Sequence, residues 1–253
     1  MKTSIFYLTL AIATGTNLSR ALAIGKSETP RSFELKYFDA RGAAETSRII
    51  FAIADEEYID TRYEITPGTM VAPDFVKAKE RGELDMNLAR APLLVADSGA
   101  MIGQSKAIER FLAKKFGLMG SSDIEAAQID CIAEHCRDVQ TAQRNKGFSF
   151  FNREKSEEEK AAARKEWFET DMPTMLEKIE KSITLTSAKS GFAVGSSNSY
   201  ADVAIFSLLK DCLDSEDSMK AAEKCDNLLS ISKRISNDEK VLKWVENRPK
   251  TNF

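Results

Sequence analysis

Hydrophobic and polar positions change their spacing partway along the chain. Between Phe33 and Phe38 apolar residues stand at alternate positions, which predicts a short strand. Past a turn at Gly42, Ile49, Ile50 and Ile53 recur at the spacing of a helix that buries one face. The first half of the chain therefore alternates between strands and helices.

The expected elements of this half follow one another closely. They are strand Phe33–Phe38, helix Ala44–Ala54, strand Tyr58–Tyr63, helix Pro73–Arg81, strand Arg90–Ala96, strand Ala100–Ile102 and helix Gln104–Phe116. Asp97, Ser98 and Gly99 form the tight turn of a hairpin between the last two strands. The order β-α-β-α-β-β-α is that of an α/β thioredoxin-like N-terminal domain, which we place at residues 32–117.

The second half of the chain is helical, after a linker at residues 117–123. The expected helices are Ile124–Asn145, Glu157–Thr184, Ser199–Leu213 and two shorter ones that end near Glu246. Together they predict an all-α C-terminal helical domain at residues 123–253.

The helix that begins after Ser199 carries a capping-box pattern. Asp202 stands three residues on, so its carboxylate can accept the Ser199 N–H while the Ser199 hydroxyl caps the helix. The following VAIFSLL is apolar on almost every side, which is typical of a central buried helix. We expect the loss of Asp202 to cost about 1–2 kcal/mol of stability and to leave any chemistry unchanged.

Residues 1–23 form a leader that precedes the fold. Lys2 stands before an apolar run from Ile5 to Ala13, and Ala21-Leu22-Ala23 is a small-x-small cleavage pattern. The run is too short for a membrane span and is typical of a secretory signal peptide. Because Arg20 and several hydroxyl residues also fit a plastid transit peptide, the plastid is an alternative to secretion, as is the cytoplasm if the leader is not used.

Composition and charge exclude several classes of function. The 253 residues are 43% hydrophobic and 30% charged with a net charge of −3, so no basic surface is expected for nucleic acid or an anionic membrane. His135 is the only histidine, which excludes a metal site built from several histidines.

Four cysteines are present, and no two of them form a C-x-x-C pair. They are Cys131, Cys136, Cys212 and Cys225, all in the helical half. This spacing does not support a zinc site or a thioredoxin-type redox motif. We expect buried or half-buried thiols, with a disulfide only in an oxidising compartment.

Three stretches, in order and at the right spacing, carry a family resemblance. They are FELKYFDARGAAETSRIIFAIADEEY, RAPLLVADSGAMIGQSKAIERFLAKKF and SYADVAIFSLL. From about residue 33 to 246 the chain resembles a soluble glutathione S-transferase of the cytosolic type. The tyrosine at the end of the first strand and the turn after it most resemble the sigma class, whose relatives include glutathione-dependent prostaglandin D synthases.

The resemblance implies a site on the first domain. Tyr37 matches the tyrosine whose hydroxyl donates a hydrogen bond to the glutathione sulfur. Arg90 stands near the glycyl end of glutathione, where the family often has a lysine. Ala91 matches the residue whose backbone pairs with the cysteinyl part, and Pro92 matches a cis-proline. Arg41 is a further candidate for contact with glutathione.

The γ-glutamyl end of glutathione has its own implied contacts. Gln104 and Ser105 match the pair that holds it, and Asp138 matches an acid that reaches the γ-glutamyl amine bound by the neighbouring subunit. A physical argument supports the first pair, because free N–H groups at the start of a helix bind carboxylates. The resemblance thus implies a homodimer.

Stabilising a thiolate requires only a small free energy. A free thiol with a pKa near 8.5 is only slightly ionised at neutral pH, and lowering its pKa by ~2 units takes ~2.7 kcal/mol. One hydrogen bond from the Tyr37 hydroxyl, helped by a nearby helix N-terminus, is of this size.

One position departs from the family pattern, and the site of the second substrate lies outside the motifs that carry the resemblance. Ala43 stands where several sigma-like relatives carry an arginine near the thiol, so that positive charge is missing at this position. The second substrate is expected between the domains, under the helix that begins at Ile124. Arg144, Phe148 and Phe151 are candidate lining residues there.

The expected function is conjugation of glutathione to apolar electrophiles, as in detoxification, with glutathione as co-substrate and no metal. One alternative is a glutathione-dependent isomerase or peroxidase that uses the same thiolate. Another is a non-enzymatic glutathione-binding or structural protein, similar to the lens proteins derived from this family. Retention of Tyr37, Gln104, Ser105 and Asp138 favours the enzyme.

Overall fold

The computed structural model describes residues 32–149, 152, 154–187 and 190–251. These residues belong to one compact unit. The expected leader at residues 1–23, and Phe151 among the candidate lining residues, lie outside the described residues.

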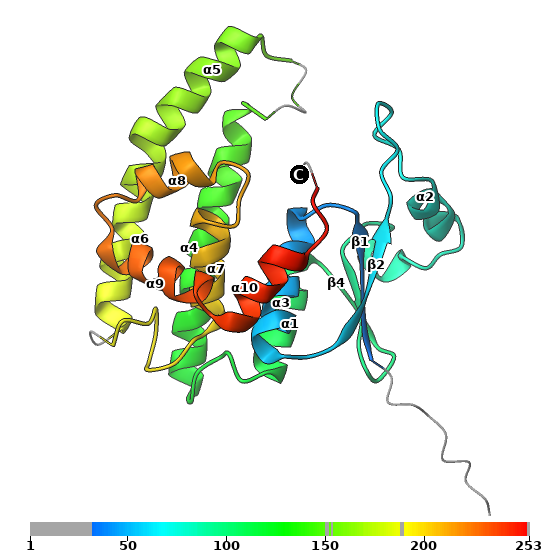
Figure 1. The fold of residues 1–253 in the computed structure, drawn as a ribbon, viewed down its shortest axis with the longest axis horizontal. Helices are drawn as coiled ribbons and strands as arrows, with labels where there is room; N and C mark the ends of the chain where they lie inside the picture. Colours follow the sequence, from blue (N-terminus) through cyan, green and yellow to red (C-terminus); the bar gives the residue numbers. More distant parts are fainter. Residues whose placement is uncertain (1–31, 150–151, 153, 188–189, 252–253) are drawn as a thin grey trace, which may run out of the picture. The chain divides into compact units, whose positions relative to one another are not determined.

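A four-stranded mixed sheet forms the first part of the fold (Figure 1). Its strands are β1 (Phe33–Phe38), β2 (Tyr58–Tyr63), β3 (Leu93–Val95) and β4 (Met101–Gly103). The order across the sheet is β2-β1-β3-β4; β1 and β2 are parallel, and the other pairs are antiparallel. In the register Tyr37 stands opposite Arg62, at the carboxyl end of β1.

Three helices accompany this sheet. They are α1 (Glu45–Ala54), α2 (Pro73–Glu80) and α3 (Ser105–Lys115), with short 3-10 segments at Gly42–Ala44 and Asp85–Asn87. Helices α1 and α3 lie between the sheet and the helical half, and α2 lies on the other side of the sheet (Figure 1). The expected thioredoxin-like order is confirmed.

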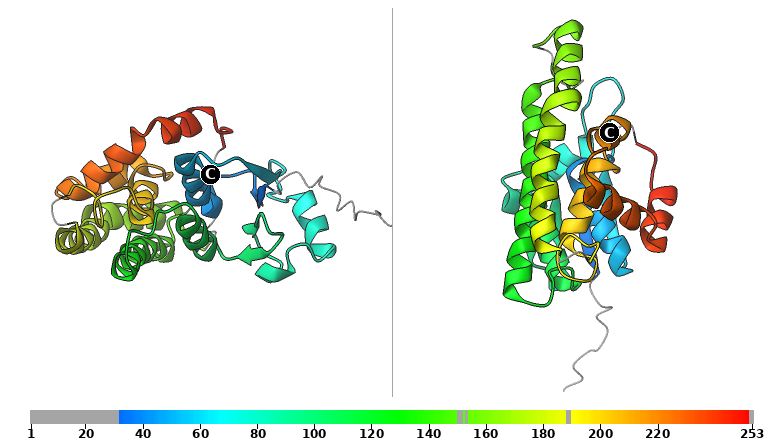
Figure 2. Two further views of the ribbon diagram at one scale, coloured as in Figure 1. Left: turned by 90° about the horizontal axis from the view of Figure 1, so that it is seen from below. Right: turned by 90° about the vertical axis from the view of Figure 1, so that its left-hand side faces the viewer.

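The helical half packs against α1 and α3. Its helices are α4 (Asp123–Lys146), α5 (Glu157–Glu166), α6 (Met172–Thr186), α7 (Tyr200–Leu209), α8 (Ser215–Ala221), α9 (Asp226–Ser236) and α10 (Glu239–Asn247). Helix α4 runs side by side with α5 and α6, which follow each other along one line (Figure 2). Every residue of α7 is buried, which confirms the prediction of a central helix.

Several expected boundaries are corrected. Strand β3 begins at Leu93 rather than Arg90, because Pro92 has no N–H to give to a ladder. Helix α7 ends at Leu209 instead of Leu213. The chain end forms three short helices rather than two, since the break at residues 222–225 contains no Gly or Pro that would reveal it.

One hydrophobic core joins the two halves. Phe33 and Leu35 of β1, Ile49 and Ile50 of α1, and the apolar residues of α7 belong to the same buried cluster. Helix α1 also packs against α10. In the part of the chain that the structure describes, no helix combines the length and hydrophobicity that crossing a bilayer requires.

Candidate functional site

The turn after β1 shapes the surroundings of the Tyr37 hydroxyl. The Ala43 N–H donates to that hydroxyl oxygen over 3.1 Å. Gly42, with φ of +40°, lies so close that an added Cβ would stand 2.6 Å from the same oxygen. Because the oxygen accepts from the backbone, the phenolic proton is left to donate to another group.

A cavity of about 530 Å³ opens beside Tyr37. Its walls come from the end of β1, the turn into α1, the β2–α2 loop, α4, and α7 with the loop that follows it. They are formed by Tyr37, Phe38, Ala40, Arg41, Gly42, Glu45, Thr46, Ile65, Met70, Gln140, Ser207, Asp211, Cys212 and Leu213. The cavity therefore has an apolar side, with Phe38 and Leu213, and a charged side, with Arg41, Glu45 and Asp211.

A second group of predicted residues lies where β3 and α3 begin. The Ala91–Pro92 peptide bond is cis, as expected from the sequence. The Ala91 backbone precedes the ladder, which starts at Leu93, so its N–H and C=O lie outside the strand pairing. Arg90 is exposed, and its Nε donates to the Asn87 carbonyl over 3.4 Å.

Asn87 connects the chain segments where β3 and α3 begin, a place that we call the corner of β3 and α3. The sequence did not identify this residue. Its Nδ2 donates to the carbonyls of Arg90 and Pro92 at 3.1 and 2.9 Å, and its Oδ1 accepts the Gln104 N–H at 3.1 Å. Gly103 gives it room, because an added Cβ there would stand 2.6 Å from Oδ1. A glycine directly before a helix was the one sequence signal for this close approach.

Gln104 and Ser105 begin α3 at the same corner. Gln104 is exposed and takes a left-handed φ of +66°, which is uncommon for a residue with a side chain. Ser105 is the first residue of the helix, so the N–H groups of the first turn lie beside Gln104. The structure thus brings together Arg90, Ala91, Pro92, Gln104 and Ser105.

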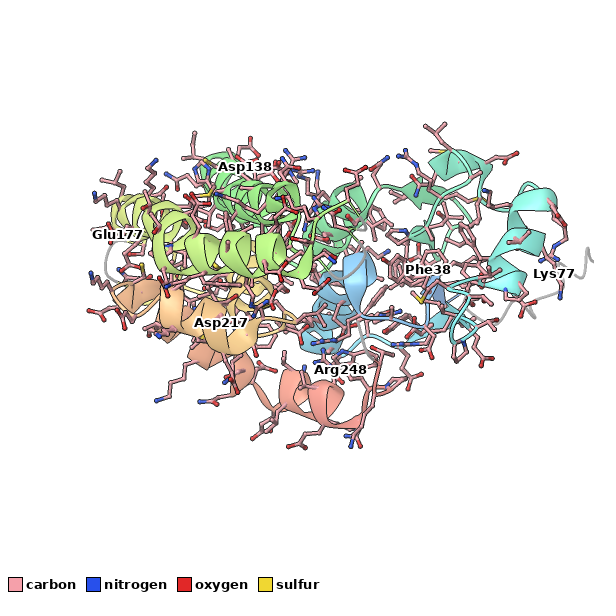
Figure 3. All side chains as sticks on the ribbon, turned by 90° about the horizontal axis from the view of Figure 1, so that it is seen from above. Phe38, Lys77, Asp138, Glu177, Asp217 and Arg248 are labelled. Atoms are coloured by element: carbon pink, nitrogen blue, oxygen red, sulfur yellow. The ribbon has the colours of Figure 1, made fainter. Side chains whose placement is uncertain are left out.

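Asp138, Arg144 and Phe148 lie elsewhere. Asp138 is exposed on the outer side of α4, away from Phe38 (Figure 3), and its predicted role needs a second chain. Arg144 is exposed and donates to Thr141, while the Phe148 ring packs against Phe168. Neither Arg144 nor Phe148 is among the residues that line the cavity, where α4 contributes Gln140.

The cysteines follow the expectation except at one position. All four are free thiols; Cys136 and Cys225 are buried, and Cys212 is half-buried. Cys131 is exposed instead, with its Sγ 3.4 Å from Nε2 of His135 one turn later. In the described chain, no group of three or more His, Cys, Asp or Glu side chains could hold a metal ion.

A buried ion network lies under the charged side of the cavity. Glu45 accepts hydrogen bonds from Arg48 at 3.0 Å and from Trp244 and Arg248 at 2.8 Å. Arg248 also pairs with Asp211 at 2.6 Å. The partners of Glu45 stand up to 203 positions away, so no local sequence pattern could have revealed them.

The two carboxyl groups of this network differ in their pKa. Burial raises the pKa of Glu45, but the Arg48 charge and the hydrogen bonds from Trp244 and Arg248 outweigh it and hold that pKa below its usual range. Burial raises the pKa of Asp211, and Arg248 offsets this only in part.

Family models match both halves of the chain. The model of the glutathione S-transferase N-terminal domain matches residues 33–114, and that of the C-terminal domain matches residues 143–248.

Curated relatives align over almost their whole length. "Probable glutathione S-transferase 9" of Caenorhabditis elegans is 30% identical over 225 residues, which cover 87% of this chain and 98% of that protein. "S-crystallin 3" of Enteroctopus dofleini is 28% identical over 227 residues, which cover 88% and 99%.

A solved structure agrees with these relatives. Monomeric Na-GST-3, a glutathione S-transferase of the hookworm Necator americanus, superposes with a TM-score of 0.69 at 28% identity, over 88% of this chain and 100% of that one. The chain therefore belongs to the glutathione S-transferase family.

Proposed function

We propose that this glutathione S-transferase conjugates glutathione to electrophiles and that the Tyr37 hydroxyl stabilises the glutathione thiolate. The observation that carries the proposal is the Tyr37 hydroxyl itself: its oxygen accepts the Ala43 N–H at 3.1 Å, and the residue lines a cavity large enough for a small molecule. Accepting one hydrogen bond strengthens the same hydroxyl as a donor to a sulfur anion.

In this proposal glutathione binds at the corner formed by β3 and α3. The Ala91 N–H and C=O would pair with the cysteinyl part in the manner of an added strand. Gln104, Ser105 and the first-turn N–H groups of α3 would hold the γ-glutamyl carboxylate. Arg90, which is exposed, would meet the glycyl carboxylate.

The reaction then needs little else from the protein. The thiolate sulfur attacks an electrophilic carbon held in the cavity beside Tyr37, and the leaving group departs with its bonding pair. Tyr37 donates to the sulfur before the attack, so the thiol proton is lost to solvent at neutral pH. The same thiolate would serve an isomerase or a peroxidase, which makes these the nearest alternatives.

A structural role also has support among the relatives. An S-crystallin is 28% identical over 88% of the chain, so this fold is also present in a protein with the name of a crystallin. A purely structural protein has no need of the cavity or of the tyrosine hydroxyl beside it, and this favours the enzyme.

Two measurements on the purified chain test the proposal. We expect the protein to be retained on glutathione-agarose and eluted by free glutathione. We also expect it to convert 1-chloro-2,4-dinitrobenzene and glutathione to the thioether, with release of chloride. Absence of both signals would favour the structural role, and retention without turnover would favour an isomerase, a peroxidase or a binding protein.

A further inference from the structure

We infer that Arg41 binds a carboxylate on the second substrate, so that this enzyme favours apolar electrophiles that carry one carboxylate. The inference rests on the proposed function and names a substrate class for the cavity beside Tyr37. It assigns Arg41 to the second substrate rather than to glutathione.

The Arg41 guanidinium lies at the charged side of the cavity and has almost no partner of its own. Its Nη1 stands 3.8 Å from Oδ1 of Asp211, too far for a hydrogen bond. Among the described residues, no hydrogen bond from the Arg41 side chain is found. The side chain is 22% exposed, so the guanidinium is partly withdrawn from water without a full set of acceptors.

The neighbouring arginines differ from Arg41 in this respect. Arg248 donates to Glu45 and pairs with Asp211 at 2.6 Å, and it satisfies the same Asp211 oxygen that Arg41 only approaches. Arg48 donates to Glu45 and to the carbonyl of Ala40. Nη2 of Arg48 has no hydrogen-bond partner either, but Arg48 is fully buried and does not line the cavity. Arg41 is therefore the guanidinium that can take a new acceptor from a ligand in the cavity without breaking a hydrogen bond.

The shape of the cavity indicates what that acceptor belongs to. Besides the charged residues, the lining contains the apolar side chains of Phe38, Ile65, Met70 and Leu213. A ligand that fills the cavity needs an apolar body and an anionic group at one end. Arg90, Gln104 and Ser105, which are proposed to hold the two carboxylates of glutathione, are not part of the lining, so we assign the anion in the cavity to the second substrate.

One carboxylate suits the charged side better than a phosphate. Glu45 and Asp211 line the same cavity, and their charges repel a dianion more strongly than a monoanion. The planar guanidinium also matches the two oxygens of a carboxylate. A second carboxylate on the ligand would meet no further free cation among the described lining residues.

A matched pair of electrophiles isolates this interaction. The acid is 4-chloro-3,5-dinitrobenzoate and the neutral partner is its methyl ester. In both, the thiolate sulfur forms a bond to the ring carbon, the carbon–chlorine bond breaks, and chloride leaves with the bonding pair. The measured quantity is the ratio of kcat/KM for the acid to kcat/KM for the ester, compared between variants so that the different reactivity of the two compounds cancels.

We expect Arg41→Gln to lower this ratio about 10- to 100-fold, the effect of one hydrogen-bonded charge pair. The ratio for Arg41→Lys should fall between those of the wild type and Arg41→Gln. Lysine keeps the positive charge but lacks the planar guanidinium, which can donate two parallel hydrogen bonds to a carboxylate. Arg81→Gln is the control: it removes an exposed arginine at the end of α2, outside the cavity, and should leave the ratio unchanged.

An unchanged ratio in Arg41→Gln would overturn the inference. If KM for glutathione rises in the same variant while the ratio stays unchanged, Arg41 belongs to glutathione.

Binding to the wild type provides a test that does not depend on turnover or on the folding of a variant. Calorimetry with unreactive 3,5-dinitrobenzoate and its methyl ester should show tighter binding of the acid, with an advantage that shrinks as salt is added. Equal binding of the two compounds contradicts the inference. If neither chloro compound is turned over but the acid still binds preferentially, the proposed transferase function fails and the carboxylate site stands.

Discussion

At the scale of single residues, Tyr37 is the side chain on which the proposed chemistry depends. Tyr37→Phe removes the hydroxyl and keeps the ring, so the apolar contacts of the side chain remain. We expect kcat to fall ~10- to 1000-fold, because the lost hydrogen bond acts on the sulfur anion. The measurement is steady-state kinetics with 1-chloro-2,4-dinitrobenzene, combined with a glutathione titration.

The glutathione titration separates two roles for Tyr37. If the hydroxyl serves the sulfur alone, the affinity for glutathione stays within a few-fold of the wild type. A variant that no longer binds glutathione would show that Tyr37 holds the ligand and that its assignment to the thiolate is wrong.

Gly42 provides a test that changes neither Tyr37 nor any residue proposed to contact glutathione. In Gly42→Ala the new methyl group would stand 2.6 Å from the Tyr37 hydroxyl oxygen, so the ring must turn away. We expect a fall in kcat of about 10-fold or more, because the hydroxyl leaves its place beside the cavity. Circular dichroism and kinetics on the same sample separate this effect from unfolding.

Gly117→Ala is the matched control for backbone strain. Gly117 also has a left-handed φ, of +74°, but nothing lies within 4 Å of the position of an added Cβ. It should lose a similar amount of stability and keep its turnover. Equal losses of kcat in both variants would mean that strain, and not displacement of Tyr37, explains the result.

Sequence alone could nominate those residues of the candidate site that sit in local patterns. Tyr37 ends an alternating strand, Pro92 precedes one, and Gln104 and Ser105 begin a helix after Gly103. The charged side of the cavity could not be found in this way. Asp211 and Glu45 are joined through Arg248, which stands 203 positions after Glu45, and only the packing of α10 on α1 brings them together.

At the scale of elements, the start of α7 is held more firmly than a capping box requires. Asp202 accepts the N–H groups of Ser199 and Ala193 at 2.9 and 3.1 Å, accepts the Ser199 hydroxyl, and pairs with Arg234. The sequence predicted the first of these contacts and a cost of about 1–2 kcal/mol. The added partners come from the preceding loop and from α9.

We therefore expect Asp202→Ala to lower the free energy of unfolding by about 3 kcal/mol or more, because the half-buried Arg234 and two backbone N–H groups lose a buried carboxylate partner. Ser199→Ala, which removes only the hydroxyl cap, should cost about 1 kcal/mol. Urea unfolding followed by tryptophan fluorescence measures both. Similar costs for the two variants would mean that the contacts beyond the cap contribute little.

The differences between expected and observed elements have local causes. Glu157–Thr184 was expected as one helix, and the structure places a π-helical turn at Trp167–Asp171 within it. Such a turn leaves no clear mark on the spacing of apolar residues. Helix α8, Ser215–Ala221, is too short for a periodic pattern to stand out.

At the scale of the whole molecule, Glu45 connects α1 to the chain end. Because its pKa is lowered in the folded state, it binds its proton less tightly than in the unfolded chain. Its stabilisation is therefore present above the ordinary value of 4.5 and is lost as the pH falls below it. Glu45→Gln should cost about 3–5 kcal/mol at pH 7 and lose less stability than the wild type on acidification.

Unfolding by urea from pH 7 down to pH 3.5 checks both parts of this prediction. Glu57→Gln is the control, since Glu57 is exposed and its change should stay within about 0.5 kcal/mol. Parallel pH curves for the wild type and Glu45→Gln would show that another carboxyl group governs acid sensitivity.

The predicted homodimer gives Asp138 its role, because this exposed residue lies on α4 outside the cavity beside Tyr37. If it serves the glutathione bound to the other subunit, Asp138→Ala should raise KM for glutathione about 10-fold or more and leave the fold unchanged. Sedimentation should show a dimer. A fully active monomer would contradict the prediction.

Mixed dimers decide whether Asp138 acts across the interface. A subunit with Tyr37→Phe is paired with a subunit that carries Asp138→Ala. If the acid acts in trans, the second subunit has its own Tyr37 and the partner's Asp138, so one site in each mixed dimer is intact. Activity then rises on mixing, above that of either variant alone. If the acid acts within its own subunit, every site keeps one defect and mixing restores nothing.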